Sequence, residues 1–148
     1  MMEEIKELID YGIMGTLLFM SFVALAVGIE RYLSIRSTKV ENFKSKAQLE
    51  KELTKRLYII ATVASNAPYV GLLGTVLGIL LTFYIIGEKG IVNTKEIMVG
   101  LALALKATAL GLIVAIPSTI LYNFLVRKVR EKLLDWEAIH GECSSSHE

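Results

Sequence analysis

Three long stretches without charged residues alternate with polar segments along this chain. Residues 11–29, 57–87 and 107–126 contain no Asp, Glu, Lys or Arg and run for 19, 31 and 20 residues. About 20 apolar residues in a helix cross the hydrocarbon layer of a bilayer. The pattern predicts an all-α, polytopic membrane protein with three transmembrane helices. The expected spans are approximately residues 11–33, 59–87 and 97–126.

The composition agrees with a membrane protein that forms one domain over residues 1–148. Hydrophobic residues make up 53% of the chain, which is more than soluble domains usually contain. The two histidines, His140 and His147, both stand in the last nine residues. The sequence therefore offers no credible metal site, and we expect no cofactor and no nucleic acid partner.

The distribution of Lys and Arg predicts the orientation of the helices. Residues 34–58 contain seven basic residues and the segment after Val126 contains four, against one in the first ten residues and two in 88–98. Loops rich in Lys and Arg stay in the cytoplasm. We expect cytoplasmic helical segments at 34–58 and 127–142, with the N-terminus in the periplasm.

Small residues and hydroxyls follow a helical spacing in the second and third apolar segments. In a membrane, such faces allow two helices to approach closely. One interpretation is that they are packing surfaces whose threonines bond to their own helix; the other is that they line a shared conduit. The face on the second segment carries Gly71, Thr75, Gly78 and Thr82, and the face on the third carries Ala104, Thr108, Gly111, Ala115 and Thr119. Gly74 is a further glycine of the second segment that we expect to pack between helices.

The two threonines are expected at the same depth in the bilayer. Thr75 lies 13 residues before Glu88, and Thr108 lies 12 residues after Glu96. Because a helix rises about 1.5 Å per residue, both hydroxyls fall roughly 18–20 Å below the outer charges. Equal depth favours the conduit interpretation.

The interiors of the apolar segments lack a group that could carry a proton. Proton transfer within membranes normally uses Asp, Glu or His, and the three stretches contain none of them. If protons pass, the titrating acid must come from another chain. Glu30 and Arg31, at the inner end of the first helix, are expected to be interfacial anchors.

Two stretches resemble the MotA/TolQ/ExbB proton-channel family, and ExbB and TolQ most closely. Residues 66–78, NAPYVGLLGTVLG, resemble its second-helix signature, and residues 107–117, ATALGLIVAIP, followed by Tyr122-Asn123, resemble its third helix. The resemblance implies a homo-oligomeric ring, a pentamer, in the bacterial inner membrane. It also implies a single-helix ExbD-like or TolR-like partner with a membrane Asp, and a TonB-like or TolA-like protein. The family's pore threonines fall on Thr75 and Thr108.

Two residues depart from the family pattern. Many members carry a glutamate five residues before the pore threonine, where this chain has Leu103. Lys106 occupies a usually apolar position and, at about 100° per residue, does not share the face of Thr108. Lys106 is either an anchor whose ammonium reaches the outer surface, or a charge that favours the ionised form of the partner's Asp.

These features predict a proton-channel and stator subunit rather than an enzyme. Such a subunit would use the proton motive force to energise an outer-membrane process such as TonB-dependent uptake. The alternatives are a TolQ-like role in envelope integrity and a structural scaffold that conducts no ions. A small secondary transporter would need a membrane acid of its own.

Overall fold

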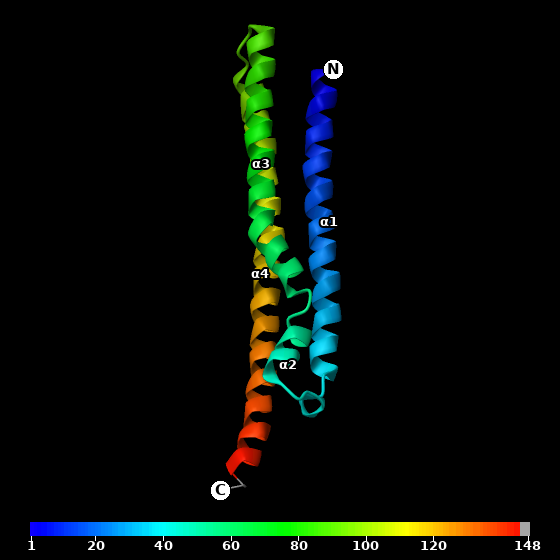
Figure 1. The fold of residues 1–148 in the computed structure, drawn as a ribbon. Helices are drawn as coiled ribbons and strands as arrows, with labels where there is room; N and C mark the ends of the chain where they lie inside the picture. The colour runs from blue at the N-terminus through cyan, green and yellow to red at the C-terminus, as the bar shows by residue number, and fades with distance from the viewer. Residues whose placement is uncertain (146–148) are drawn as a thin grey trace.

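The computed structural model describes residues 1–145, which form an all-helical chain (Figure 1). Three of the helices are long and apolar enough to cross a membrane. The elements in chain order are α1 Met2–Ser37, the 3₁₀ turn η1 Val40–Asn42, α2 Lys46–Leu53, α3 Leu57–Lys89 and α4 Thr94–Ser145.

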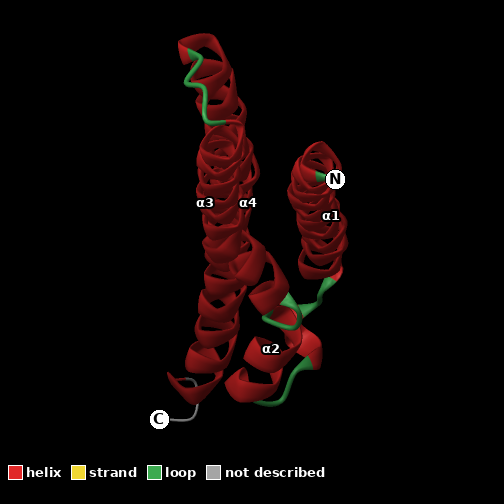
Figure 2. Cartoon of the chain, turned by 90° about the horizontal axis from the view of Figure 1, so that it is seen from above, coloured by secondary structure: helices red, strands yellow, loops and turns green. Residues whose placement is uncertain are grey.

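The helices α3 and α4 form a long antiparallel pair, and α1 packs along this pair. Figure 2 shows α1 beside the two overlapping helices α3 and α4, with α2 near one end of the molecule. The N-terminus and the α3–α4 loop lie at the same end of the molecule, which we name the loop end (Figure 1). The short helix α2 marks the opposite end, which we name the α2 end.

The segment 34–58 is helical only in part, whereas the sequence predicts a helical segment throughout. The Thr38 hydroxyl donates to the Ser34 carbonyl at 2.7 Å where α1 ends. The Ser45 hydroxyl accepts from the Gln48 amide and caps α2. Hydroxyl side chains compete with the helical ladder and favour helix ends. Past residue 126 the chain stays helical, because these residues belong to α4, which runs to Ser145.

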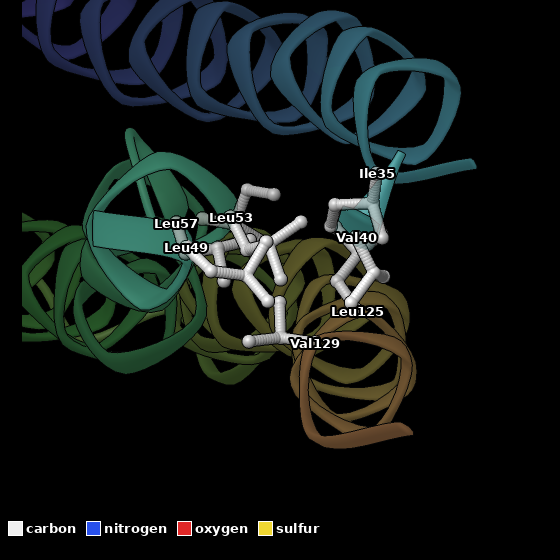
Figure 3. Close-up of a cluster of buried hydrophobic side chains, with 8 residues drawn as sticks. Ile35, Val40, Leu49, Leu53, Leu57, Leu125 and Val129 are labelled. Carbon is white, nitrogen blue, oxygen red and sulfur yellow. The ribbon is translucent and has the colours of Figure 1, made fainter. Parts of the chain in front are cut away.

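A cluster of aliphatic side chains holds the α2 end together (Figure 3). It draws on every helix and on η1, and we name it the α2 core. Burying aliphatic side chains away from water is the main force that drives such packing. Its buried members are Ile35, Val40, Leu49, Leu53, Leu57, Ile60, Leu125 and Val129.

Polar contacts fasten the end of α4 to the segment around η1 and α2. The Trp136 indole N–H donates to the Phe43 carbonyl at 3.0 Å, and the Lys132 ammonium donates to the Thr38 carbonyl at 3.2 Å. Lys46 pairs with Glu137, and the hydrogen bond from this carboxylate raises the pKa of the Lys46 ammonium. The segment between α1 and α3 therefore packs directly on α4.

Candidate functional site

The small faces of α3 and α4 pack directly on each other. A Cβ added at Gly111 would lie 2.7 Å from the Ala67 carbonyl oxygen, and one added at Gly71 would lie 2.7 Å from the Ala107 carbonyl oxygen. Only glycine leaves room for backbones this close. We name this interface the small-residue seam. It comprises Ala67, Gly71, Gly74, Thr75, Gly78, Ala104, Ala107, Thr108 and Gly111.

The other two predicted packing glycines, Gly74 and Gly78, also make their close contacts within one copy of the chain. A Cβ at Gly78 would approach the Ala104 Cβ to 2.8 Å. A Cβ at Gly74 would meet the Ala107 Cβ at 2.7 Å and the Ile13 Cγ2 at 3.0 Å. Gly74 is therefore one point at which α1 reaches the seam, and Ala67, which clusters with Leu17 of α1, is another.

Thr75 and Thr108 meet at the centre of the seam, with their hydroxyl oxygens in hydrogen-bond contact. The Thr75 hydroxyl donates across the interface to the Ala104 carbonyl at 2.9 Å, while its own-helix acceptor, the Gly71 carbonyl, lies at 3.4 Å. A hydroxyl has one proton to donate and two lone pairs. Thr75 can therefore accept from Thr108 while it donates to Ala104. The contact confirms that the two hydroxyls lie at one level.

Other hydroxyls on the same two helices behave differently. Thr82 donates to the Gly78 carbonyl at 2.8 Å, Ser118 to the Val114 carbonyl at 2.7 Å and Thr119 to the Ala115 carbonyl at 2.8 Å. Each of these acceptors lies four residues earlier on the donor's own helix. Bonding within the helix is thus the ordinary arrangement here, and Thr75 departs from it.

The two threonines of the pair differ in their exposure. Thr75 is 8% exposed, whereas Thr108 is partly exposed. The close approach of Gly71 and Gly111 brings the two faces into contact, so they do not line an open conduit within one chain. Any path past the hydroxyls must run along the edge of the seam where Thr108 is accessible.

Comparison with known families decides what kind of protein carries this seam. The profile of the MotA/TolQ/ExbB proton channel family matches residues 21–138, which include both threonines. The chain belongs to this family. It is accordingly a membrane protein of a transport family and not an enzyme.

Relatives from Helicobacter pylori align with most of this ExbB-like chain. A biopolymer transport protein named ExbB-like 2 is 48% identical over 144 residues, covering 97% of this chain and 96% of the relative. The biopolymer transport protein ExbB is 49% identical over 127 residues, covering 86% and 88%. ExbB of Pseudomonas putida is 45% identical over 71 residues, which is 48% of this chain and 22% of that protein.

Arg31 follows the first uncharged stretch, and its buried side chain links α1 to the segment between α1 and α3. We name its contacts the brace. Its guanidinium is 3% exposed and donates to both Glu30 carboxylate oxygens, at 2.6 and 3.0 Å. It also reaches the Glu52 carbonyl at 3.4 Å. Arg56, whose backbone is left-handed with φ 63°, approaches the Glu30 carboxylate to 3.5 Å. The brace ties α1 to the junction of α2 and α3.

Lys106 lies off the threonine face, as its position on the helix predicts. Its Nζ is 3.8 Å from the Asp10 Oδ2 on α1, and both side chains are 45% exposed. Leu103 lines a cavity beside this pair. Within residues 1–141, whose side chains the structure describes, no three His, Cys, Asp or Glu side chains lie close enough together to hold a metal ion.

Sequence reasoning missed Asp10 as the counter-ion of Lys106. A signal for it was available in the charge pattern. Asp10 is the last charge before the uncharged stretch 11–29, and Lys106 is the last charge before 107–126. Two helices with the same direction and comparable apolar lengths place such edge charges at similar levels.

Proposed function

We propose that this chain is the channel-forming and stator subunit of an ExbB-like energiser in a bacterial inner membrane. The observation that carries the proposal is the pairing of Thr75 and Thr108 across the seam, with Thr75 bonded to the facing helix. Both threonines stand at the family's pore positions. The basic segment 34–58 and the residues after Val126 favour the cytoplasm for the α2 end and the periplasm for the loop end.

The hydroxyl pair is suited to solvate a carboxylate that another chain brings into the membrane. Thr75 donates to Ala104, so the Thr108 proton can turn from Thr75 toward an incoming acid. A carboxylate in a membrane is costly when it is bare, and a hydrogen bond to the charged form stabilises it. Protonation removes this charge and changes which contacts are favourable, so each proton can bias a movement of the partner helix.

The assembly that fits this role contains several copies of the chain and a different partner. We propose a homo-oligomeric ring, a pentamer, around an ExbD-like or TolR-like single-helix protein that carries a membrane Asp. Large apolar side chains such as Phe19, Phe22 and Leu80 are exposed along α1 and α3, which suits contact with lipid or neighbouring copies. A TonB-like protein would receive the work for uptake through the outer membrane.

The test replaces each hydroxyl by a methyl group of similar size. Thr75→Val and Thr108→Val should assemble normally and reduce proton flux by roughly tenfold or more, because a hydrogen bond to a charged group is worth about 1.5–3 kcal/mol. Flux is measured in liposomes that contain the chain and its single-helix partner. Thr82→Val is the matched control, since Thr82 is 6% exposed on the same helix but bonds to its own carbonyl ladder.

Parental flux in both threonine variants would remove the support for a conduit and favour the scaffold alternative. The TolQ-like alternative predicts a different cellular defect. Deletion of the chain would then sensitise cells to detergents and leave TonB-dependent uptake intact. Loss of uptake with an intact envelope supports the ExbB-like role.

A further inference from the structure

The ion pair between Asp10 and Lys106 joins α1 to α4 near the loop end. Its atoms are 3.8 Å apart, and both residues stand at the edge of an uncharged stretch. Among the side chains of residues 1–141, it is the single ion pair between these two helices.

A cavity of about 330 Å³ separates α1 from the seam beside this pair. Gly74, Gly78, Ala104 and Ala107 form much of the wall on α3 and α4. On the side of the cavity away from the loop end, α1 does reach this wall, because Ile13 lies against Gly74 and Leu17 packs in a cluster with Ala67 and Ala115. Closer to the loop end, Asp10 lines the cavity, and its contact with Lys106 joins α1 to α4 beside it.

Two short series of neighbouring residues connect the ion pair to the centre of the seam. Lys106 precedes Ala107, which contacts Gly74, and Thr108 follows directly in the chain. On the α1 side, Asp10 is one helical turn before Ile13, which also lies against Gly74. Gly74 in turn neighbours Thr75. The position of α1 is thereby coupled through Gly74 to both threonines.

We infer that Asp10 and Lys106 form a positioning contact that seats the outer part of α1 on the small-residue seam. Lys106 then has a carboxylate partner within its own chain. Its charge is held at α1, so it does not act as a free cation beside the partner's Asp. The inference that this ion pair positions α1 does not depend on the proposed function. Its consequence for proton flux does rest on that function.

Spin-label distances between α1 and α4 test the contact. Leu8 and Leu105, two exposed positions on these helices, are replaced by cysteines in a Cys143→Ser background, and a spin label is attached to each. Labelled chain is assembled with an excess of unlabelled chain, so that distances within one copy dominate. The parent should give one narrow distance peak, because the ion pair fixes the two helices.

Lys106→Met and Asp10→Asn should each lose the narrow peak, since each removes one charge and keeps most of the side chain. The charge exchange Asp10→Lys with Lys106→Asp should restore it. Lys6→Met is the matched control, because Lys6 lines the same cavity and has no ion-pair partner among the side chains of residues 1–141. The control should keep the parental peak.

A narrow peak in either single variant, or failure of the exchange to restore it, overturns the inference and leaves Lys106 as an anchor at the membrane surface. The Thr75→Val and Thr108→Val variants should keep the narrow peak while they lose proton flux. Failure of the positioning contact and failure of the proposed function therefore give different results.

Discussion

The small-residue seam and the α2 core both hold α4 against its neighbours, but with opposite kinds of side chain. The seam brings backbones together, with the Gly71 and Gly111 positions closed to any added carbon. The α2 core instead buries Leu49, Ile60 and Leu125 completely. In water, burial of aliphatic groups drives packing. Between helices in a membrane this force is absent, and close van der Waals contact with a few hydrogen bonds replaces it.

The same contrast governs the polar groups of the two regions. In the seam, the Thr75 hydroxyl finds its acceptor, the Ala104 carbonyl, on the facing helix. At the α2 end, Arg31 donates to the carbonyl of Glu52 in the last turn of α2, and Trp136 donates to the carbonyl of Phe43, which follows η1. At the α2 end, polar side chains thus donate to backbone carbonyls near the ends of short elements. In the seam, two hydroxyl side chains instead pair with each other.

The largest expected effect comes from placing bulk in the seam. Gly111→Leu must push α3 and α4 apart, because its Cβ alone would lie 2.7 Å from the Ala67 carbonyl oxygen. We expect a loss of more than about 3 kcal/mol, the upper range for overpacked interiors, measured by unfolding with increasing SDS. Gly12→Leu is the control, since nothing lies within 4 Å of its added Cβ. Equal stability of the two variants would show that the seam does not hold the hairpin.

A smaller effect is expected from a cavity in the α2 core. Leu53→Ala removes a side chain that is 1% exposed and should cost about 2–5 kcal/mol. Leu134→Ala, at a half-exposed position of α4, should cost far less. Hydrogen exchange should increase in α2 and remain slow around Thr75. Simultaneous loss of protection in both places would mean that the two regions unfold as one unit.

The smallest effect is expected at the brace near the α2 end. Arg31→Met keeps the stem but leaves the Glu52 carbonyl without its side-chain donor, at a cost of about 1–3 kcal/mol. The measurement is the midpoint of thermal unfolding in detergent. Arg127→Met is the control, because its ion pair with Glu131 is at the surface. An equal midpoint in both variants would make Arg31 a simple interfacial anchor.

The sequence by itself determined the three long helices and the level of the threonines. Both follow from distances along one chain: the length of an uncharged stretch, the helical repeat and the rise per residue. The glycines of the seam were visible for the same reason, since their spacing places them on one face. The break after Ser37 was not predicted, because the competing bond from Thr38 to Ser34 depends on local side-chain geometry.

Only the tertiary structure decided which groups meet across helices. Thr75 donates to Ala104 instead of its own helix, Lys106 pairs with Asp10, and Arg31 is buried at the end of α2. Each contact depends on the rotation of one helix about its axis relative to another, and no spacing within a single helix fixes that rotation. For α3 and α4, the close approach at Gly71 and Gly111 sets this rotation, because backbone contact allows little freedom of rotation or separation.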